Sequence, residues 1–189
     1  MFDKNFTTFV PDRNDRKYNG IILNDDVVCY MDGSRIERAG LAGAGVYVQT
    51  DREEVVVPLG YHTCVFQAEV FVLLTCAKLE NLLFRNNCSI VICSDSLAVI
   101  KSVSAYKATI GLVADAMTAL KVLATFSSVR LIWVPGHCGI AGNEKVDILA
   151  KQASSSCFTG PEPSVGISVS TICSYISSWA VREQNRLWC

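Results

Sequence analysis

The sequence predicts an α/β protein with one mixed β-sheet, and two patterns carry this prediction. Apolar segments at residues 26–34, 45–50 and 55–60 are separated by short polar or glycine-containing turns, which is typical of an antiparallel meander. A second pair of apolar segments, at residues 89–94 and 129–134, is separated by helical sequence, which predicts parallel strands joined by crossover helices. Together the two patterns predict a sheet with both antiparallel and parallel strands, flanked by helices.

Helices are predicted from apolar residues that recur at helical spacing and from residues that favour helix termini. The longest has apolar residues at positions 70, 73, 74 and 77, so we expect it to be largely buried. The predicted helices cover residues 66–84, 97–103, 110–126, 144–153 and 169–187.

The chain is predicted to have one folded domain with an extension at each end. Residues 1–25 hold four basic and four acidic residues without periodicity, which indicates a loose lead-in. A segment rich in Ser, Gly and Pro after Ala153 predicts a linker before the final helix. We therefore expect a lead-in at 1–25, a domain at 26–153, and a linker with a C-terminal helix at 154–189.

Composition indicates a globular protein of a reducing compartment. Hydrophobic residues make up 50% of the chain and charged residues 19%, and the formal net charge of −1 gives no basic footprint for nucleic acid. The nine cysteines form no C-x-x-C pair, which argues against a zinc site and favours free thiols inside the cell, in the cytoplasm or nucleus. The N-terminal M-F-D-K-N-F is interrupted by charge, unlike a signal peptide, and the apolar run at 70–77 is too short to cross a membrane. We expect a monomer without membrane contact.

One loop is predicted to be functional. The stretch W-V-P-G-H-C-G-I-A-G-N-E-K-V-D, residues 133–147, places His137 among three glycines and is followed by a helix, with Asn143 as its expected N-cap. Glu144 and Asp147 then fall in the first turn of that helix. A titratable side chain on a small-residue loop beside a carboxylate on a helix is typical of a catalytic loop, although a plain strand–helix connection is the alternative.

Four acidic residues are predicted to gather at one edge of the sheet. Asp32 ends the first strand and Asp95 ends the fourth, Glu69 lies in the first turn of the long helix, and Asp147 follows the His137 loop. Each has an ordinary structural explanation, such as an Asp that begins a turn or a Glu that favours a helix N-terminus. Carboxylates that meet at the carboxyl ends of parallel strands cannot all be ionised without a cation. A donor set of carboxylates selects Mg²⁺ or Mn²⁺ over zinc. The glycines at 40, 43 and 45 suggest a phosphate-binding loop, but they lie between two strands and lack the Lys-Ser/Thr ending of a P-loop.

Four motifs in order resemble the ribonuclease H family: D-G-S at 32–34, Q-A-E at 67–69, S-D-S at 94–96, and the W-V-P-G-H-x-G-I-x-G-N-E-x-x-D stretch. The resemblance covers residues 26–153 and is closest to the ribonuclease H domains of non-LTR retrotransposons. It implies a ribonuclease H-like fold, with a mixed five-stranded sheet in the order 3-2-1-4-5 flanked by helices.

The resemblance also implies a mechanism and a set of site residues. Asp32 would bridge two Mg²⁺ ions, with Mn²⁺ as the alternative, Asp147 would complete one metal position, and Glu69 and Asp95 would complete the other. His137 would assist proton transfer or product release. The residues expected along the RNA strand of an RNA–DNA hybrid are Gly33, Ser34, Gln67, Ser96 and Asn143.

One departure from the family concerns substrate binding. Cellular relatives insert a basic, Trp-bearing segment between the fourth and fifth strands, whereas residues 95–133 here hold four basic residues and no Trp before Trp133. We therefore expect weak binding of the hybrid by the chain alone, and a reverse transcriptase, linked covalently or non-covalently, as a partner.

Three functions remain open on the sequence alone. The first is a metal-dependent endonuclease that cuts the RNA strand of RNA–DNA hybrids. The second is a catalytically silent module that binds a hybrid or a protein partner through the same fold. The third is a related DNA-cutting nuclease, against which the G-H-x-G-x-x-G-N-E loop argues.

Overall fold

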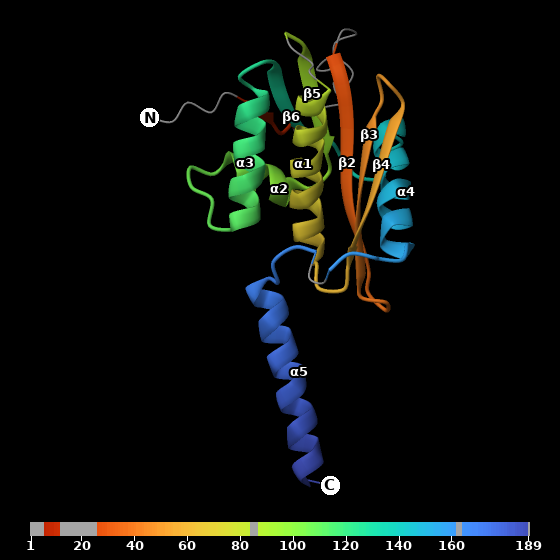
Figure 1. Cartoon of the computed structure of the whole chain (residues 1–189), viewed down its shortest axis with the longest axis vertical. Helices are drawn as coiled ribbons and strands as arrows, with labels where there is room; N and C mark the ends of the chain where they lie inside the picture. The colour runs from red at the N-terminus through yellow and green to blue at the C-terminus, as the bar shows by residue number, and fades with distance from the viewer. Residues whose placement is uncertain (1–5, 12–25, 84–86, 162–163, 189) are drawn as a thin grey trace.

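The computed structural model describes residues 6–11, 26–83, 87–161 and 164–188, and it has a single six-stranded sheet with helices on both faces (Figure 1). The strands are β1 (Thr7–Phe9), β2 (Asp26–Ile36), β3 (Leu41–Val48), β4 (Glu53–Gly60), β5 (Ser89–Ser94) and β6 (Ser128–Trp133). The helices are α1 (Val65–Leu82), α2 (Leu97–Ser104), α3 (Gly111–Leu123), α4 (Ala141–Ser155) and α5 (Val169–Trp188).

The sheet is mixed, as predicted, and its order is β1-β6-β5-β2-β3-β4. Strands β2, β3 and β4 form the expected antiparallel meander, while β2, β5 and β6 are parallel neighbours joined by helical crossovers. The predicted order 3-2-1-4-5 corresponds to β4-β3-β2-β5-β6 and is confirmed.

The predicted number of five strands is wrong, because β1 adds a sixth at the free edge of β6. This strand pairs in parallel with β6, with Thr7 opposite Arg130 and Phe9 opposite Ile132. It lies in the segment predicted to be a loose lead-in. All three residues of β1 are exposed, so the strand has no burial pattern that a sequence could reveal. Phe6, which precedes it, is buried in the core.

Two hydrophobic layers fix the helices to the sheet. Helix α1 packs on β2 and β3, α3 packs on α1, and α2 contacts β6, so these three helices share one face (Figure 1). Helix α4 covers β2, β3 and β4 from the other face, where Val146 packs with Tyr30 and Val28. The strands between these layers are buried on both sides, which explains their almost continuous apolar sequence.

Gly43 allows α4 to pack directly against the sheet. A Cβ atom at this position would lie 2.2 Å from the backbone nitrogen of Ser154, so no larger residue fits. The sequence prediction of a glycine-rich loop over residues 40–45 is wrong, because β3 begins at Leu41 and contains both Gly43 and Gly45. Glycine in a strand here indicates the close approach of a helix rather than a turn.

The C-terminal helix α5 forms as predicted and projects away from the sheet (Figure 1). None of its residues is buried, and its Tyr175 hydroxyl is hydrogen-bonded to Nδ1 of His62 at 3.3 Å. Among the described residues, no helix has the length and apolar character needed to cross a bilayer. The eight cysteines in the described part of the chain are all free thiols, and Cys29 and Cys93 are buried in the apolar core.

Candidate active site

Two of the predicted acids lie at the same edge of the parallel part of the sheet. Asp95 follows β5 immediately, as expected. Asp32 lies inside β2 rather than at its end, because the strand continues to Ile36 beside β3. Tyr30 is, however, the last β2 residue that pairs with β5, so Asp32 lies just beyond the parallel pairing. A carboxylate placed there faces the crevice where α/β sheets bind their ligands.

Glu69 comes to the same place from α1. The helix begins at Val65, so Glu69 lies in its second turn, and the prediction that it lies in the first turn is wrong. A favourable interaction with the helix dipole therefore does not explain the position of Glu69. One carboxylate oxygen from each of Asp32, Glu69 and Asp95 lies within 4.8 Å of the others. The structure thus brings together three of the four predicted metal ligands.

Gly33 makes this convergence possible because it has no side chain between β2 and α1. A Cβ atom on Gly33 would lie 2.6 Å from the backbone nitrogen of Glu69. The Gly33 N–H also donates a hydrogen bond of 2.8 Å to Oδ1 of Asp32. Gly33 therefore positions two of the acids through its backbone. Its predicted contact with the RNA strand stays a prediction.

Burial and mutual repulsion raise the pKa values of the acids. The pKa of Asp32 rises from 3.8 to about 7, first because the carboxyl group is buried and then because Asp95 and Asp147 are negatively charged. The Gly33 amide and the ammonium group of Lys151 oppose this shift. Burial, followed by the charges of Asp32 and Asp95, holds the pKa of Glu69 well above its usual value. A cation beside carboxyl groups of this kind stabilises their ionised form and lowers their pKa values.

The residues present fit a divalent cation. Oε2 of Glu69 is buried and has no hydrogen-bond partner, which is costly for a carboxylate unless a positive ion contacts it. The three donors are all carboxylate oxygens, the ligands that Mg²⁺ and Mn²⁺ prefer. Asp32, Glu69 and Asp95 would hold such an ion, which would stabilise the negative charge that develops at a phosphate under attack.

Asp147 does not belong to the group of three acids. It lies on α4, and its Oδ2 accepts a hydrogen bond of 2.7 Å from Nζ of Lys151, one helical turn further along. Its charge nevertheless contributes to the raised pKa of Asp32, so the two carboxylates are electrostatic neighbours. The ion pair with Asp147 in turn raises the pKa of Lys151.

Two polar contacts hold Asp95 in place. The Nε1–H group of Trp133 donates a hydrogen bond of 2.9 Å to the backbone carbonyl of Asp95. Nδ2 of Asn143 lies 3.4 Å from Oδ2 of the same residue, and Oδ1 of Asn143 is buried without a hydrogen-bond partner. The prediction that Asn143 caps α4 is wrong, because the helix already begins at Ala141 and its N-cap is Ile140. Asn143 instead connects the first turn of α4 to the acids.

His137 lies on the loop between β6 and α4, as predicted, but its imidazole is not part of the acid cluster. Its side chain is 74% exposed, and Nδ1 lies 4.0 Å from Oε2 of Glu144. The backbone of His137 has a φ of 53°, in the left-handed region that non-glycine residues rarely occupy. The loop therefore presents the ring to solvent beside the site.

The remaining predicted substrate residues have different surroundings. Ser34 and Ser96 are half-buried near Asp32 and Asp95 in sequence. Gln67 is 7% exposed, and its amide is already used: Oε1 accepts a hydrogen bond from the Cys64 N–H, and Nε2 donates to the carbonyl of Gly166. Gln67 thus joins the start of α1 to the segment before α5, on the wall of a pocket of about 630 Å³.

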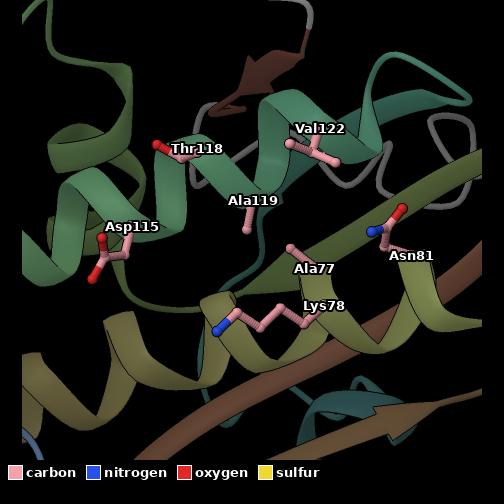
Figure 2. A pocket seen from close by; sticks show the side chains of 7 residues that line it. All are labelled: Ala77, Lys78, Asn81, Asp115, Thr118, Ala119 and Val122. Carbon is pink, nitrogen blue, oxygen red and sulfur yellow. The ribbon is translucent and has the colours of Figure 1, made fainter.

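Another pocket, of about 340 Å³, lies between α1 and α3 (Figure 2). None of the four predicted metal ligands lines it. Ala77 and Ala119 face each other across it, with Lys78 on α1 and Asp115 on α3 at its rim. Ala77 is more than two helical turns from Glu69 along α1. This pocket therefore has no part in the chemistry of the acids.

Sequence reasoning missed two residues of the site. Lys151 follows Asp147 by four residues on a predicted helix, a spacing that favours an ion pair, so this contact could have been predicted. The hydrogen bond from Trp133 to the Asp95 backbone joins residues 38 positions apart and depends on the pairing of β5 with β6. No local sequence signal indicates it.

Comparison with known proteins agrees with this geometry. The family model described as RNase H matches residues 24–155, which include β2 to β6, α1 to α4 and all four acids. No curated protein matches the chain. The matched region covers well over half of the sequence, and the chain belongs to the RNase H family.

Proposed function

We propose that this chain is an endonuclease that hydrolyses the RNA strand of RNA–DNA hybrids with two Mg²⁺ ions. The observation that carries the proposal is the convergence of Asp32, Glu69 and Asp95, each of which has one carboxylate oxygen within 4.8 Å of those of the others. The chain's membership of the RNase H family supports the same function. The raised pKa of Asp32 and the unpartnered Oε2 of Glu69 support a cation at this position.

We assign a role in metal binding, in orienting the ligands or in proton transfer to each residue of the site. Asp32, Glu69 and Asp95 would hold one ion, and Asp32 with Asp147 would hold the other. Two such ions, when bound, stabilise the attacking and the leaving oxygens of an in-line displacement at phosphorus. Asn143 and Trp133 keep Asp95 oriented through the contacts described above. His137, exposed on its loop, would exchange a proton with solvent close to the scissile phosphate.

The choice of RNA over DNA would rest on the 2′-hydroxyl group, which is the feature that distinguishes the two strands of a hybrid. Ser34 and Ser96 offer half-buried hydroxyl groups next to Asp32 and Asp95 in the sequence, and we assign them to contacts with the RNA strand. Gln67 and Asn143 are buried. A contact from Gln67 requires its amide to give up or share its present hydrogen bonds, whereas Oδ1 of Asn143 has no hydrogen-bond partner.

We also propose that the domain derives from a non-LTR retrotransposon and acts beside a linked reverse transcriptase. Two segments support this origin by their sequence: V-F-Q-A-E at residues 65–69, which contains the Q-A-E motif, and W-V-P-G-H at residues 133–137. The scarcity of basic residues between Asp95 and Trp133 supports the need for a partner that holds the substrate. This segment has four basic residues, and one of them, Arg130, forms an ion pair with Asp26 at 2.6 Å.

A cleavage assay tests the proposed function. The purified chain is incubated with an RNA–DNA hybrid, duplex DNA and duplex RNA of the same sequence, each with Mg²⁺ or with a chelator. We expect cleavage of the RNA strand of the hybrid alone, and only with Mg²⁺. Cleavage of duplex DNA would instead assign a DNA-cutting nuclease, and binding without cleavage would assign a silent module.

A further inference from the structure

Asp147 and Lys151 set the fourth acid of the site apart from the other three. Asp32, Glu69 and Asp95 already face one another within 4.8 Å, so their position needs only a cation. Asp147 has its Oδ2 bound to Nζ of Lys151 at 2.7 Å, and the two residues lie one turn apart on the same rigid helix. The fourth ligand is therefore satisfied by a positive charge from its own chain.

The ion pair is weak enough for a divalent ion to displace. The Lys151 side chain is 60% exposed and that of Asp147 is 20% exposed. Exposed pairs of this kind contribute little to stability because water screens them and the long Lys side chain loses freedom in forming them. An oxygen held by an ammonium group is not available to a metal ion in the same geometry, so Lys151 and a metal ion compete for Oδ2 of Asp147.

We propose that Lys151 is a positioning residue that occupies Asp147 in the metal-free protein, so that the two metal positions are filled in order. The first ion enters the position formed by Asp32, Glu69 and Asp95. The second requires Lys151 to leave Asp147, which lowers the affinity of this position and allows Asp147 to turn toward Asp32. The proposal rests on the proposed function, because it presumes that Asp147 is a metal ligand.

The direction of the electrostatic effect agrees with this role. The positive charge of Lys151 acts on Asp32 as well as on Asp147 and partly compensates the cluster of acids. The ammonium group thus stabilises the metal-free site and must repel an incoming cation. An ordinary helix-stabilising pair has no such link to metal binding.

A second ion pair on the same helix provides the matched control. Nζ of Lys145 lies 2.8 Å from Oε1 of Glu54, and the two side chains are 41% and 42% exposed. Lys145→Met removes the same charge from the same helix without touching any of the four acids. Lys151→Arg keeps a cation beside Asp147 and serves as the conservative variant.

The experiment titrates the metal-free full chain with Mg²⁺ by isothermal calorimetry, for the wild type, Lys151→Met, Lys151→Arg, Lys145→Met and Asp32→Asn. We expect the second binding event of Lys151→Met to be up to about fivefold tighter than in the wild type, the upper end of the range that corresponds to an exposed ion pair. Lys151→Arg and Lys145→Met should resemble the wild type. The melting temperature, measured with and without Mg²⁺, should rise more on Mg²⁺ addition in Lys151→Met than in Lys145→Met.

Two outcomes overturn the proposal and are distinguishable. If Asp32→Asn loses Mg²⁺ binding but Lys151→Met binds Mg²⁺ no more tightly than Lys145→Met, the acid site stands and the role of Lys151 is wrong. If Asp32→Asn binds Mg²⁺ as well as the wild type does, the proposed metal site itself is wrong and the role of Lys151 fails with it.

Discussion

The backbone nitrogen of Glu69 lies only 2.6 Å from the place where a Cβ atom on Gly33 would stand, so β2 and α1 meet through their main chains. This contact brings Glu69 next to Asp32, the residue that precedes Gly33. The D-G-S motif therefore has a structural reason for its glycine: any side chain there would move the helix that carries one of the acids.

We predict that Gly33→Ala destabilises the protein by about 1–3 kcal/mol, the usual cost of forcing extra volume into a packed core. Chemical denaturation measures this change in the free energy of unfolding. Gly111→Ala is the control, because a Cβ atom at Gly111 meets nothing within 4 Å and its φ is not in the left-handed region. Equal stability of the two variants would show that β2 and α1 are not in close contact at Gly33.

The stability of the metal-free protein should fall as the pH rises from about 4 to about 7. The pKa of Asp32 is 3.8 in an unperturbed group and about 7 in the folded protein, so the folded state binds more protons over this range. Stability conferred by the protonated acid is complete below pH 4 and is lost as the pH passes the folded pKa. The loss attributable to Asp32 is on the order of 2–4 kcal/mol, and the raised pKa of Glu69 acts in the same direction.

Denaturation curves at several pH values, in the presence of a chelator, measure this loss. Asp32→Asn should flatten the pH dependence and increase the stability at pH 8, because an amide cannot be deprotonated and does not repel Asp95. In the wild type, added Mg²⁺ should also flatten the pH dependence of stability, because a bound cation stabilises the ionised acids. A metal-free wild type that becomes more stable between pH 5 and pH 8 would contradict the assignment of the raised pKa values.

Replacement of His137 should slow the reaction without affecting metal binding. His137→Asn is the suitable change, because asparagine tolerates the left-handed φ of 53° at this position while the imidazole is removed. Assistance by a general acid or base accounts for about 10²–10⁴-fold in rate, so the turnover number should decrease by a factor in this range.

The control for His137→Asn is Cys138→Ala, a change to the next exposed residue of the same loop, which should leave the rate near that of the wild type. Calorimetry should show unchanged Mg²⁺ binding for both variants. A loss of Mg²⁺ binding in His137→Asn, or a loss of activity as complete as that of Asp95→Asn, would show that His137 acts with the metal ligands.

The chain alone should bind a hybrid weakly. Eleven basic and twelve acidic residues between Asp26 and Ala153 give the domain a formal charge of −1, so few phosphates can be neutralised. We predict a Kd of about 1 µM or higher and a slope of only ~2–3 in a plot of log K against log salt. Fluorescence anisotropy at several salt concentrations, with Asp32→Asn to prevent cleavage, measures both. Nanomolar binding with a steep salt dependence would contradict this view of the surface.

The resemblance to the ribonuclease H family predicted the order of five strands, and the sequence pattern predicted the placement of Asp95. Asp95 is predictable because a continuous apolar run indicates a strand buried on both faces, and the strand ends where the polar residues begin. The convergence of Asp32, Glu69 and Asp95 was predicted from their places at strand ends and near a helix start, whereas their division between two metal positions came from the resemblance to a family.

The errors have a common physical cause, which is that tertiary contacts are not visible in local sequence. Gly43 was interpreted as part of a loop because nothing near it in sequence indicates that α4 packs against it. Strand β1 was missed because its three exposed residues are held by backbone pairing with β6 and by a hydrogen bond from the Ser104 hydroxyl to that of Thr8, contacts that no local pattern indicates. Asn143 was assigned to the N-cap of α4 from its residue type, whereas the helix begins two residues earlier.

The most direct test of the account is the rate at which the wild type and Asp95→Asn cut each strand of one RNA–DNA hybrid as Mg²⁺ is increased. The two strands carry different labels, and the enzyme is in excess so that weak binding does not limit the measurement. We predict that the wild type cuts the RNA strand only, at a rate that rises with Mg²⁺, and that Asp95→Asn cuts neither strand at any Mg²⁺ concentration. Cleavage by Asp95→Asn at the wild-type rate, or cleavage of the RNA strand by the wild type without a divalent ion, would contradict the assignment of the acids as the metal site of a ribonuclease H.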